Sequence, residues 1–183
     1  MRTALARTDR YSTGAIWFHW TIALLVLVNL FIGLFHESLL DGFDGAMPLH
    51  KSIGLLVLVL TIGRLGWRLA HQPPALPPGM PGWEKTAAHA MHWTLYALLL
   101  IMPLTGWIMS SHTRVPHPIW FFGLFQVPFL PVTRGAAGVA HESHELLGYL
   151  MTALVVLHIA AALRHHLILR NSVLLRMFPA LGR

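Results

Sequence analysis

Four histidines lie within or at the edges of long apolar stretches, where an ionisable side chain is costly and so suggests a functional site: His19, His50, His144 and His158. His144 and His158 are fourteen residues apart in the last such stretch. Fourteen residues is close to four helical turns, so both rings face the same side of one helix. Their separation is ~21 Å along the helix axis, a large part of the ~30 Å hydrocarbon core of a bilayer. One helix can therefore present a ligand near each side of a membrane.

The elements that must position these histidines are four apolar runs. The runs cover residues of about 16–35, 49–69, 87–109 and 146–169, each close to the roughly 20 residues that a spanning helix needs. The chain is 55% hydrophobic and only 11% charged, against roughly 25% charged residues in a soluble domain. Backbone groups in lipid must be satisfied within the segment, which selects helices. We therefore predict one all-α integral-membrane domain over residues 1–183, an antiparallel four-helix bundle in contact with the lipid bilayer.

The region between the third and fourth runs is too interrupted to span. Its apolar segments, 119–125 and 127–130, are short and are surrounded by prolines. Proline removes a backbone donor and breaks regular structure, so this region is predicted to be a loop. The prolines concerned are Pro116, Pro118, Pro128 and Pro131.

Basic residues orient the predicted bundle. Ten of the thirteen Lys and Arg residues fall on the side of the two termini, and three, Lys51, Arg114 and Arg134, fall on the other. The positive-inside rule then places both termini in the cytoplasm, in a bacterial inner membrane. The basic residues flank apolar segments and form no basic domain, which argues against nucleic acid as a partner. The ten are Arg2, Arg7, Arg10, Arg64, Arg68, Lys85, Arg164, Arg170, Arg176 and Arg183.

Orientation gives each histidine a depth. His50 and His144 come near the outer face, and His19 and His158 come near the inner face. Two imidazoles on facing helices can bind one flat iron porphyrin, and a bundle core is a usual place for such a site. Two alternatives remain open at this stage: hydrogen-bonded packing histidines, and a zinc site, although the chain has no HExxH motif.

Two arginines could bind the carboxylates of such a cofactor. Arg64 follows His50 by fourteen residues, so it shares its helix face and reaches the depth of His19 and His158. Arginine is a natural bidentate partner for a carboxylate. Arg164, six residues after His158, is a second candidate. The alternative is that both arginines extend to the lipid headgroups and serve only orientation.

Ordered motifs along the chain resemble the prokaryotic cytochrome b561 family of four-helix dihaem membrane proteins. They are His19-Trp20, His50-Lys51-Ser52-Ile53-Gly54, Arg64-Leu65-Gly66-Trp67-Arg68, Pro103-Leu104-Thr105-Gly106-Trp107, His144-Glu145, His158 and His165-His166. The resemblance implies two non-covalent b-type haems, with His19, His50, His144 and His158 as axial iron ligands. One branch of this family oxidises superoxide and reduces ubiquinone. This chain departs from that branch in its acidic 37–44 connection, where the branch carries arginines, and an acidic rim repels superoxide.

On the strength of this resemblance, we expect a membrane electron-transfer oxidoreductase that takes electrons from superoxide and reduces ubiquinone. The first alternative is a cytochrome b subunit serving a separate dehydrogenase, hydrogenase or soluble cytochrome. The second is a haem-free proton-coupled transporter that uses membrane histidines as a relay. Histidine can donate a hydrogen bond to a quinone, which makes His89, His92, His165 and His166 candidates on the inner side. A rival outer set is His112, His117 and His141, with Trp107 and Trp120 available to pack on a ring.

Overall fold

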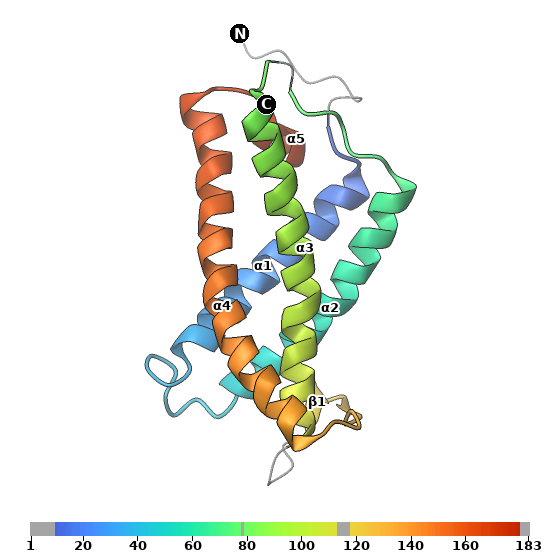
Figure 1. The fold of residues 1–183 in the computed structure, drawn as a ribbon, viewed down its shortest axis with the longest axis vertical. Coiled ribbons are helices and arrows are strands. Elements are labelled where there is room, and N and C mark those ends of the chain that lie inside the picture. The colour runs from blue at the N-terminus through green and yellow to red at the C-terminus, as the bar shows by residue number, and fades with distance from the viewer. Residues whose placement is uncertain (1–9, 78, 113–117, 180–183) are drawn as a thin grey trace.

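Four long antiparallel helices dominate the structure, a computed structural model that describes residues 10–77, 79–112 and 118–179 (Figure 1). They are α1 (Thr13–Phe35), α2 (Ala46–Ala70), α3 (Gly82–Ser111) and α4 (Arg134–Leu163). All four are long and apolar enough to cross a membrane. The prediction of a four-helix membrane bundle is therefore confirmed. Several residues used in the sequence predictions lie outside the described ranges: Arg2, Arg7, Arg114, Pro116, His117 and Arg183.

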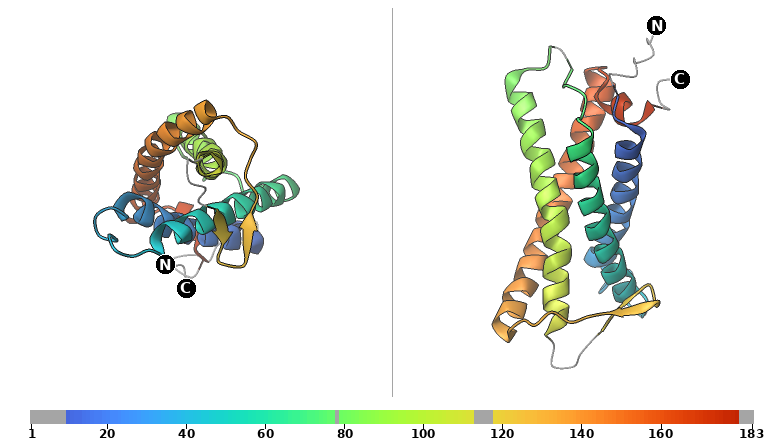
Figure 2. Two further views of the ribbon diagram at one scale, coloured as in Figure 1. Left: turned by 90° about the horizontal axis from the view of Figure 1, so that it is seen from below. Right: turned by 90° about the vertical axis from the view of Figure 1, so that its right-hand side faces the viewer.

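The two ends of the bundle differ. At one end α1 begins, α4 ends and the short helix α5 (Val173–Met177) lies close by; we call this the terminal end (Figure 1). At the other end lie the connection between α1 and α2 and a small β-hairpin; we call this the hairpin end (Figure 2). The end of α4 widens into a single π-helical turn, η2 (Arg164–Ile168).

The hairpin corrects the prediction that the region around segments 119–125 and 127–130 is a loop. Strands β1 (Ile119–Phe121) and β2 (Phe125–Val127) pair antiparallel. Phe122 and Gly123 take positive φ angles of 48° and 75° between the strands, a geometry that suits the twist of a tight hairpin but strains a non-glycine residue. Ser52 of α2 holds this turn, because its hydroxyl oxygen accepts the Phe122 N–H at 3.0 Å. The prolines interrupt the segment on both sides without preventing this short pairing.

Helix α4 is longer than its apolar run. The sequence predicted a span from about residue 146, whereas the helix begins at Arg134. The side chain of Thr133 caps the helix by accepting the Ala136 N–H at 3.2 Å. A helix needs only a cap and continuous backbone hydrogen bonds, so it can extend beyond the segment that lipid requires to be apolar. His144 consequently lies about three turns inside α4 and not at its start.

Packing within the bundle is uneven. Helix α3 packs closely along α4, α1 along α2, and α2 against α3, whereas α1 and α4 share few close contacts and α2 and α4 fewer still. The view along the bundle shows α4 separated from α2 in this way (Figure 2). The buried core lies mainly around α2 and α3, with Ile53, Val57, Leu98 and Leu99 at its centre. Helix α4 therefore makes few direct contacts with α1 and α2.

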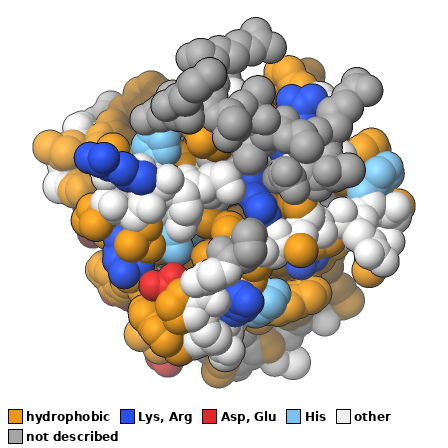
Figure 3. Space-filling view, turned by 90° about the horizontal axis from the view of Figure 1, so that it is seen from above, with side chains coloured by type: hydrophobic (Ala, Val, Ile, Leu, Met, Phe, Trp, Pro, Cys, Tyr) orange, Lys and Arg blue, Asp and Glu red, His pale blue; other side chains and the backbone are white. Residues whose placement is uncertain are grey.

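The C-terminal segment closes the terminal end. The Trp20 indole N–H donates to the Met177 carbonyl at 2.8 Å, and the Trp20 ring lies 5.3 Å from that of Phe178. Arg176 is buried and donates hydrogen bonds to the Ala75 carbonyl and the Ser172 hydroxyl. Seen from this end, basic and histidine side chains are spread among hydrophobic ones, with few acidic atoms in view (Figure 3).

Candidate functional site

Two histidine pairs bridge the sparsely packed side of α4. At the hairpin end the rings of His50 (α2) and His144 (α4) have centroids 6.1 Å apart. At the terminal end the rings of His19 (α1) and His158 (α4) have centroids 6.3 Å apart. The structure thus brings the four histidines together as two pairs at two levels, with one member of each pair on α4.

The spacing of the rings suits a metal between them. Half of the 6.1 Å or 6.3 Å separation is about 3 Å. That length accommodates a metal–nitrogen bond of about 2 Å plus the distance from a ring nitrogen to the ring centre. Among the described residues no group of three or more His, Asp or Glu side chains is arranged to hold a metal ion. Two-histidine coordination is therefore the arrangement that these residues can offer, and it fits the two axial positions of an iron porphyrin.

Hydrogen bonds fix the tautomer of the hairpin-end pair. His50 Nδ1 lies 3.1 Å from the Asn29 carbonyl oxygen, and His144 Nδ1 lies 3.1 Å from the Met102 carbonyl oxygen. A carbonyl can only accept, so each Nδ1 carries the hydrogen and each Nε2 keeps its lone pair. The Thr105 hydroxyl, 3.0 Å from His144 Nδ1, adds a second acceptor. Such partners are the usual means of orienting a metal-binding histidine.

Two glycines make room for these same rings. A β-carbon at Gly33 would lie 3.0 Å from Cε1 of His50, and one at Gly106 would lie 3.2 Å from Cε1 of His144. Both distances are shorter than an ordinary van der Waals contact of roughly 3.5–4.0 Å. The two rings are therefore held by hydrogen bonds on one edge and by closely approaching backbone on another.

We expect Gly33→Ala to displace the His50 ring and weaken cofactor retention at the hairpin end. Crowding of this kind costs about 1–3 kcal/mol, since the ring is tied to the Asn29 carbonyl and cannot move freely. Haem content and the absorption spectrum of the purified variant measure the effect. The matched control is Gly54→Ala on α2, where the nearest atom would lie at 3.7 Å. An unaltered Gly33→Ala spectrum would show that the close approach has no bearing on this site.

The terminal-end pair is surrounded differently. Within the described part of the chain, Nδ1 of His19 is buried without a hydrogen-bond partner. The ring of His92 on α3 lies 5.6 Å from that of His158. Three imidazoles from α1, α3 and α4 therefore gather here, and the His19–His158 separation of 6.3 Å is the one that matches the hairpin-end pair. His92 lies close enough to contact whatever the pair binds.

Arg64 lies half-buried at the same level. Its guanidinium lies over the Tyr96 ring, 5.1 Å from the centroid. Tyr11, just before α1, lies in the same region, and burial raises the pKa of its hydroxyl, which keeps that group neutral. No carboxylate of the described residues pairs with Arg64. Arg164, in contrast, is already paired with Glu84, at 3.1 Å from Nη1 to Oε1, so Arg64 is the better placed of the two to receive a cofactor carboxylate.

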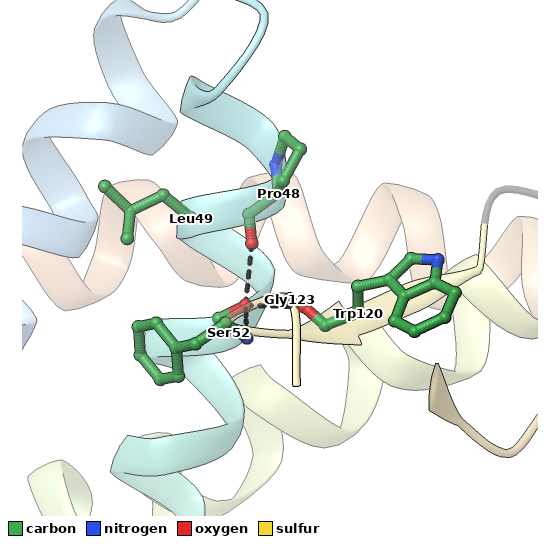
Figure 4. A pocket seen from close by; sticks show the side chains of 6 residues that line it. Pro48, Leu49, Ser52, Trp120 and Gly123 are labelled. Carbon is green, nitrogen blue, oxygen red and sulfur yellow. Dashed lines mark hydrogen bonds between the residues drawn. The ribbon is translucent and has the colours of Figure 1, made fainter. Parts of the chain in front are cut away.

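An apolar hollow of about 280 Å³ lies at the hairpin end, between α2 and the β-hairpin. Figure 4 shows the Ser52 hydroxyl between the Pro48 and Trp120 carbonyls, at 2.9 Å and 3.0 Å. This hydroxyl also accepts the Phe122 N–H. Its only donor hydrogen is therefore already engaged by backbone carbonyls. Trp120 lines the hollow, whereas His112 and His141 are exposed and do not line it. The two described histidines of the rival outer set, His112 and His141, are thus not brought together in this hollow.

The inner histidine candidates are separated by the structure. His89 is exposed, and His166 makes no side-chain hydrogen bond within the described ranges. His165 is largely buried, with its side chain 13% exposed, and lies near Glu84. Its Nδ1 accepts a hydrogen bond from the Asn171 side-chain amide at 2.8 Å. Of the four histidines proposed to bind quinone, His165 is the one whose ring is both largely buried and held by a side-chain hydrogen bond.

Some of these residues were not identified from the sequence. Asn29 is a lone amide in an apolar run, and its carbonyl, not its side chain, contacts His50. Glu84 could have been noticed, since it is an acid on the basic side of the chain, where acids are few. Asn171, which holds His165, is a polar residue just after the last apolar run.

Four apolar helices that carry two pairs of histidines, each pair spaced to hold one metal ion, are the features expected of a membrane cytochrome. The comparison of sequences is more specific: residues 10–180 match the prokaryotic cytochrome b561 family, and the chain belongs to that family. It is 35% identical to cytochrome b561 homolog 2 of Escherichia coli strain K12, over 92% of this chain and 91% of the relative. It is 29% identical to a probable superoxide oxidase CybB of Yersinia pestis, over 93% and 96%. It is also 29% identical to cytochrome b562 of Cereibacter sphaeroides, over 91% and 94%.

The family makes this chain a multi-pass membrane electron-transfer protein and implies b-type haem. The histidine pairs fit that cofactor by their spacing and, at the hairpin end, by their fixed tautomers.

Proposed function

We propose that this protein carries electrons across a bacterial inner membrane, from a donor at the hairpin end to ubiquinone at the terminal end. The termini then lie in the cytoplasm. The observation that supports this most directly is the presence of two facing histidine pairs at two levels of one bundle, with His144 and His158 both on α4.

Two haems would be held by His50 with His144 and by His19 with His158, and when bound they supply one-electron transfer between the two levels. With two histidines holding each haem, the group would carry electrons and would not bind a substrate at its iron. The protein's own work is then to orient the rings, exclude water and balance charge. Arg64 would balance the charge of a haem propionate at the terminal-end level, and Arg164 remains a weaker candidate because Glu84 already occupies it.

Quinone is assigned to the terminal end because of hydrogen bonding. A quinone headgroup needs a donor at its carbonyl oxygens, and His165 offers a largely buried ring held in one orientation by Asn171. His92, His89 and His166 are further candidates on the same side. The hollow at the hairpin end offers apolar surface, but its Ser52 hydroxyl is already engaged.

Superoxide is the first candidate donor, since a relative of similar length is named a probable superoxide oxidase. Lys51, on α2 next to His50, and Arg134 would provide positive charge at the hairpin end. The exposed acids of the connection between α1 and α2, Glu37, Asp41 and Asp44, favour a second candidate, a redox protein partner with a basic surface.

The test is an absorption experiment on the purified protein. We expect superoxide to reduce the haem bands rapidly and added ubiquinone to reoxidise them. Superoxide dismutase added beforehand is the control, because it removes the donor without affecting the protein. If quinol reduces the haem but superoxide does not, superoxide is not the donor. The donor would then be a protein partner. A protein purified without haem would contradict the proposal and leave the histidine relay of a transporter as the alternative.

A further inference from the structure

Glu84 occupies an unusual position at the terminal end. It lies in the first turn of α3, yet its side chain is only 10% exposed. One carboxylate oxygen, Oε1, accepts a hydrogen bond from Arg164 Nη1 at 3.1 Å. The other, Oε2, lies 4.0 Å from His165 Nε2. The second distance is too long for a hydrogen bond, so one oxygen is paired and the other faces a ring nitrogen without bonding to it.

The orientation of His165 is determined by Asn171. The Asn171 side-chain oxygen accepts the Val173 N–H at 3.2 Å, which turns the amide nitrogen toward His165. That nitrogen, which can only donate, lies 2.8 Å from His165 Nδ1. In the neutral ring Nδ1 is therefore the acceptor, and the hydrogen is on Nε2. The Nε2–H of His165 is thus on the side of the ring that faces Glu84 Oε2.

The backbone supports the same arrangement. Residues 164–168 form the π-helical turn η2, closed by the Leu169 N–H on the Arg164 carbonyl at 3.0 Å. The Asn171 N–H then returns to the His165 carbonyl at 3.0 Å. Single π-helical turns are rare and often occur at functional sites. Here the turn lets two consecutive residues, Arg164 and His165, both reach Glu84.

A gap of 4.0 Å between Nε2 and Oε2 is suited to a third group. One oxygen atom can lie within about 3 Å of both atoms at once, at an ordinary hydrogen-bond distance from each. A quinone carbonyl oxygen in that position would accept the His165 Nε2–H and lie beside the Glu84 carboxyl group. Arg176 of α5, the short helix that contacts η2, donates to Ala75 and Ser172 and forms no ion pair with Glu84.

We propose that Glu84 is the proton donor for quinone reduction at the terminal end, a proposal that rests on the quinone assignment to His165. Quinone takes two electrons from the haems and two protons to become quinol. Glu84, a carboxylate paired with Arg164 at rest, takes a proton from water at the terminal face and passes it to the oxygen that His165 holds. Water at the terminal face also supplies the proton of the second oxygen.

The decisive variant is Glu84→Gln, which keeps the shape of the side chain and removes its exchangeable acid proton. We expect quinone reduction to slow by about tenfold, which is below the usual range for losing a general acid. The KM for quinone and both haem spectra should stay unchanged, because His165 and Arg164 are intact. The pH profile of the rate should lose one titration. Infrared difference spectra of reduction with quinone present should lose a carboxyl band that the unmodified protein shows.

Three further variants separate the possible outcomes. Glu142→Gln changes an exposed acid on α4 at the other end and should leave the rate, the pH profile and the band unchanged. If Arg164→Gln slows quinone reduction as much as Glu84→Gln with an unaltered pH profile, the ion pair is structural and the proposal fails. If His165→Ala slows the reaction while Glu84→Gln has the rate of the unmodified protein at every pH, the proton assignment alone is wrong. If His165→Ala has no effect, the quinone site itself is misplaced.

Discussion

Replacing His144 by alanine is expected to reduce the haem content from two per chain to one. The ring of His144 faces that of His50 at 6.1 Å, and its Nδ1 is tied to the Met102 carbonyl and Thr105. Removing the His144 ring takes away one of the two histidines that would hold this haem. The half-buried ring of His50 is then left without its partner. His50→Ala should have the same effect. The terminal-end haem should remain, since its pair lies ~21 Å away along α4.

A pyridine haemochrome assay with a protein concentration standard measures this loss. His19→Ala and His158→Ala should each remove the other haem, which gives two pairs of variants with matching stoichiometry and different residual spectra. His141→Ala is the control, because that ring is exposed on the same helix, less than one turn from His144. One haem per chain in the unmodified protein would contradict the pairing. So would an identical residual spectrum in all four variants.

The second large effect is expected for His165→Ala. If the Nε2–H of this ring holds a quinone oxygen beside Glu84, its loss removes both the hydrogen bond and the correct placement of the proton donor. Quinone reduction should then slow on the order of a hundredfold. Both haem spectra should be preserved, because His165 lies seven residues beyond His158 and belongs to neither pair.

Turnover with a soluble quinone analogue, measured against the haem content of each preparation, tests this expectation. His166→Ala tests the neighbouring candidate and should change turnover less than His165→Ala, because the His166 ring makes no side-chain hydrogen bond in the described part of the chain. A loss of turnover in His112→Ala or His141→Ala, with His165→Ala unaffected, would place the quinone at the hairpin end. Its apolar hollow beside Trp120 would then be the site to examine.

Local patterns in the sequence were enough to predict the bundle and the levels of its histidines. A segment of about 20 apolar residues must be helical in lipid whatever surrounds it. Once it is helical, the interval of fourteen residues between His144 and His158 sets both their common face and their separation. These are properties of one segment at a time, so no tertiary information is needed to derive them.

The surroundings of the histidines depend on contacts between distant segments. His50 is held by a main-chain carbonyl of α1, which any residue type at position 29 would present, so its identity carries no signal. The early start of α4 depends on the Thr133 cap, and the β-hairpin on one hydroxyl of α2. Glu84 meets Arg164 and His165 across eighty residues of chain, only because α3 and α4 pack together and η2 widens the last turn. Periodicity determines which face of a helix a residue occupies, but only packing determines which atoms that face meets.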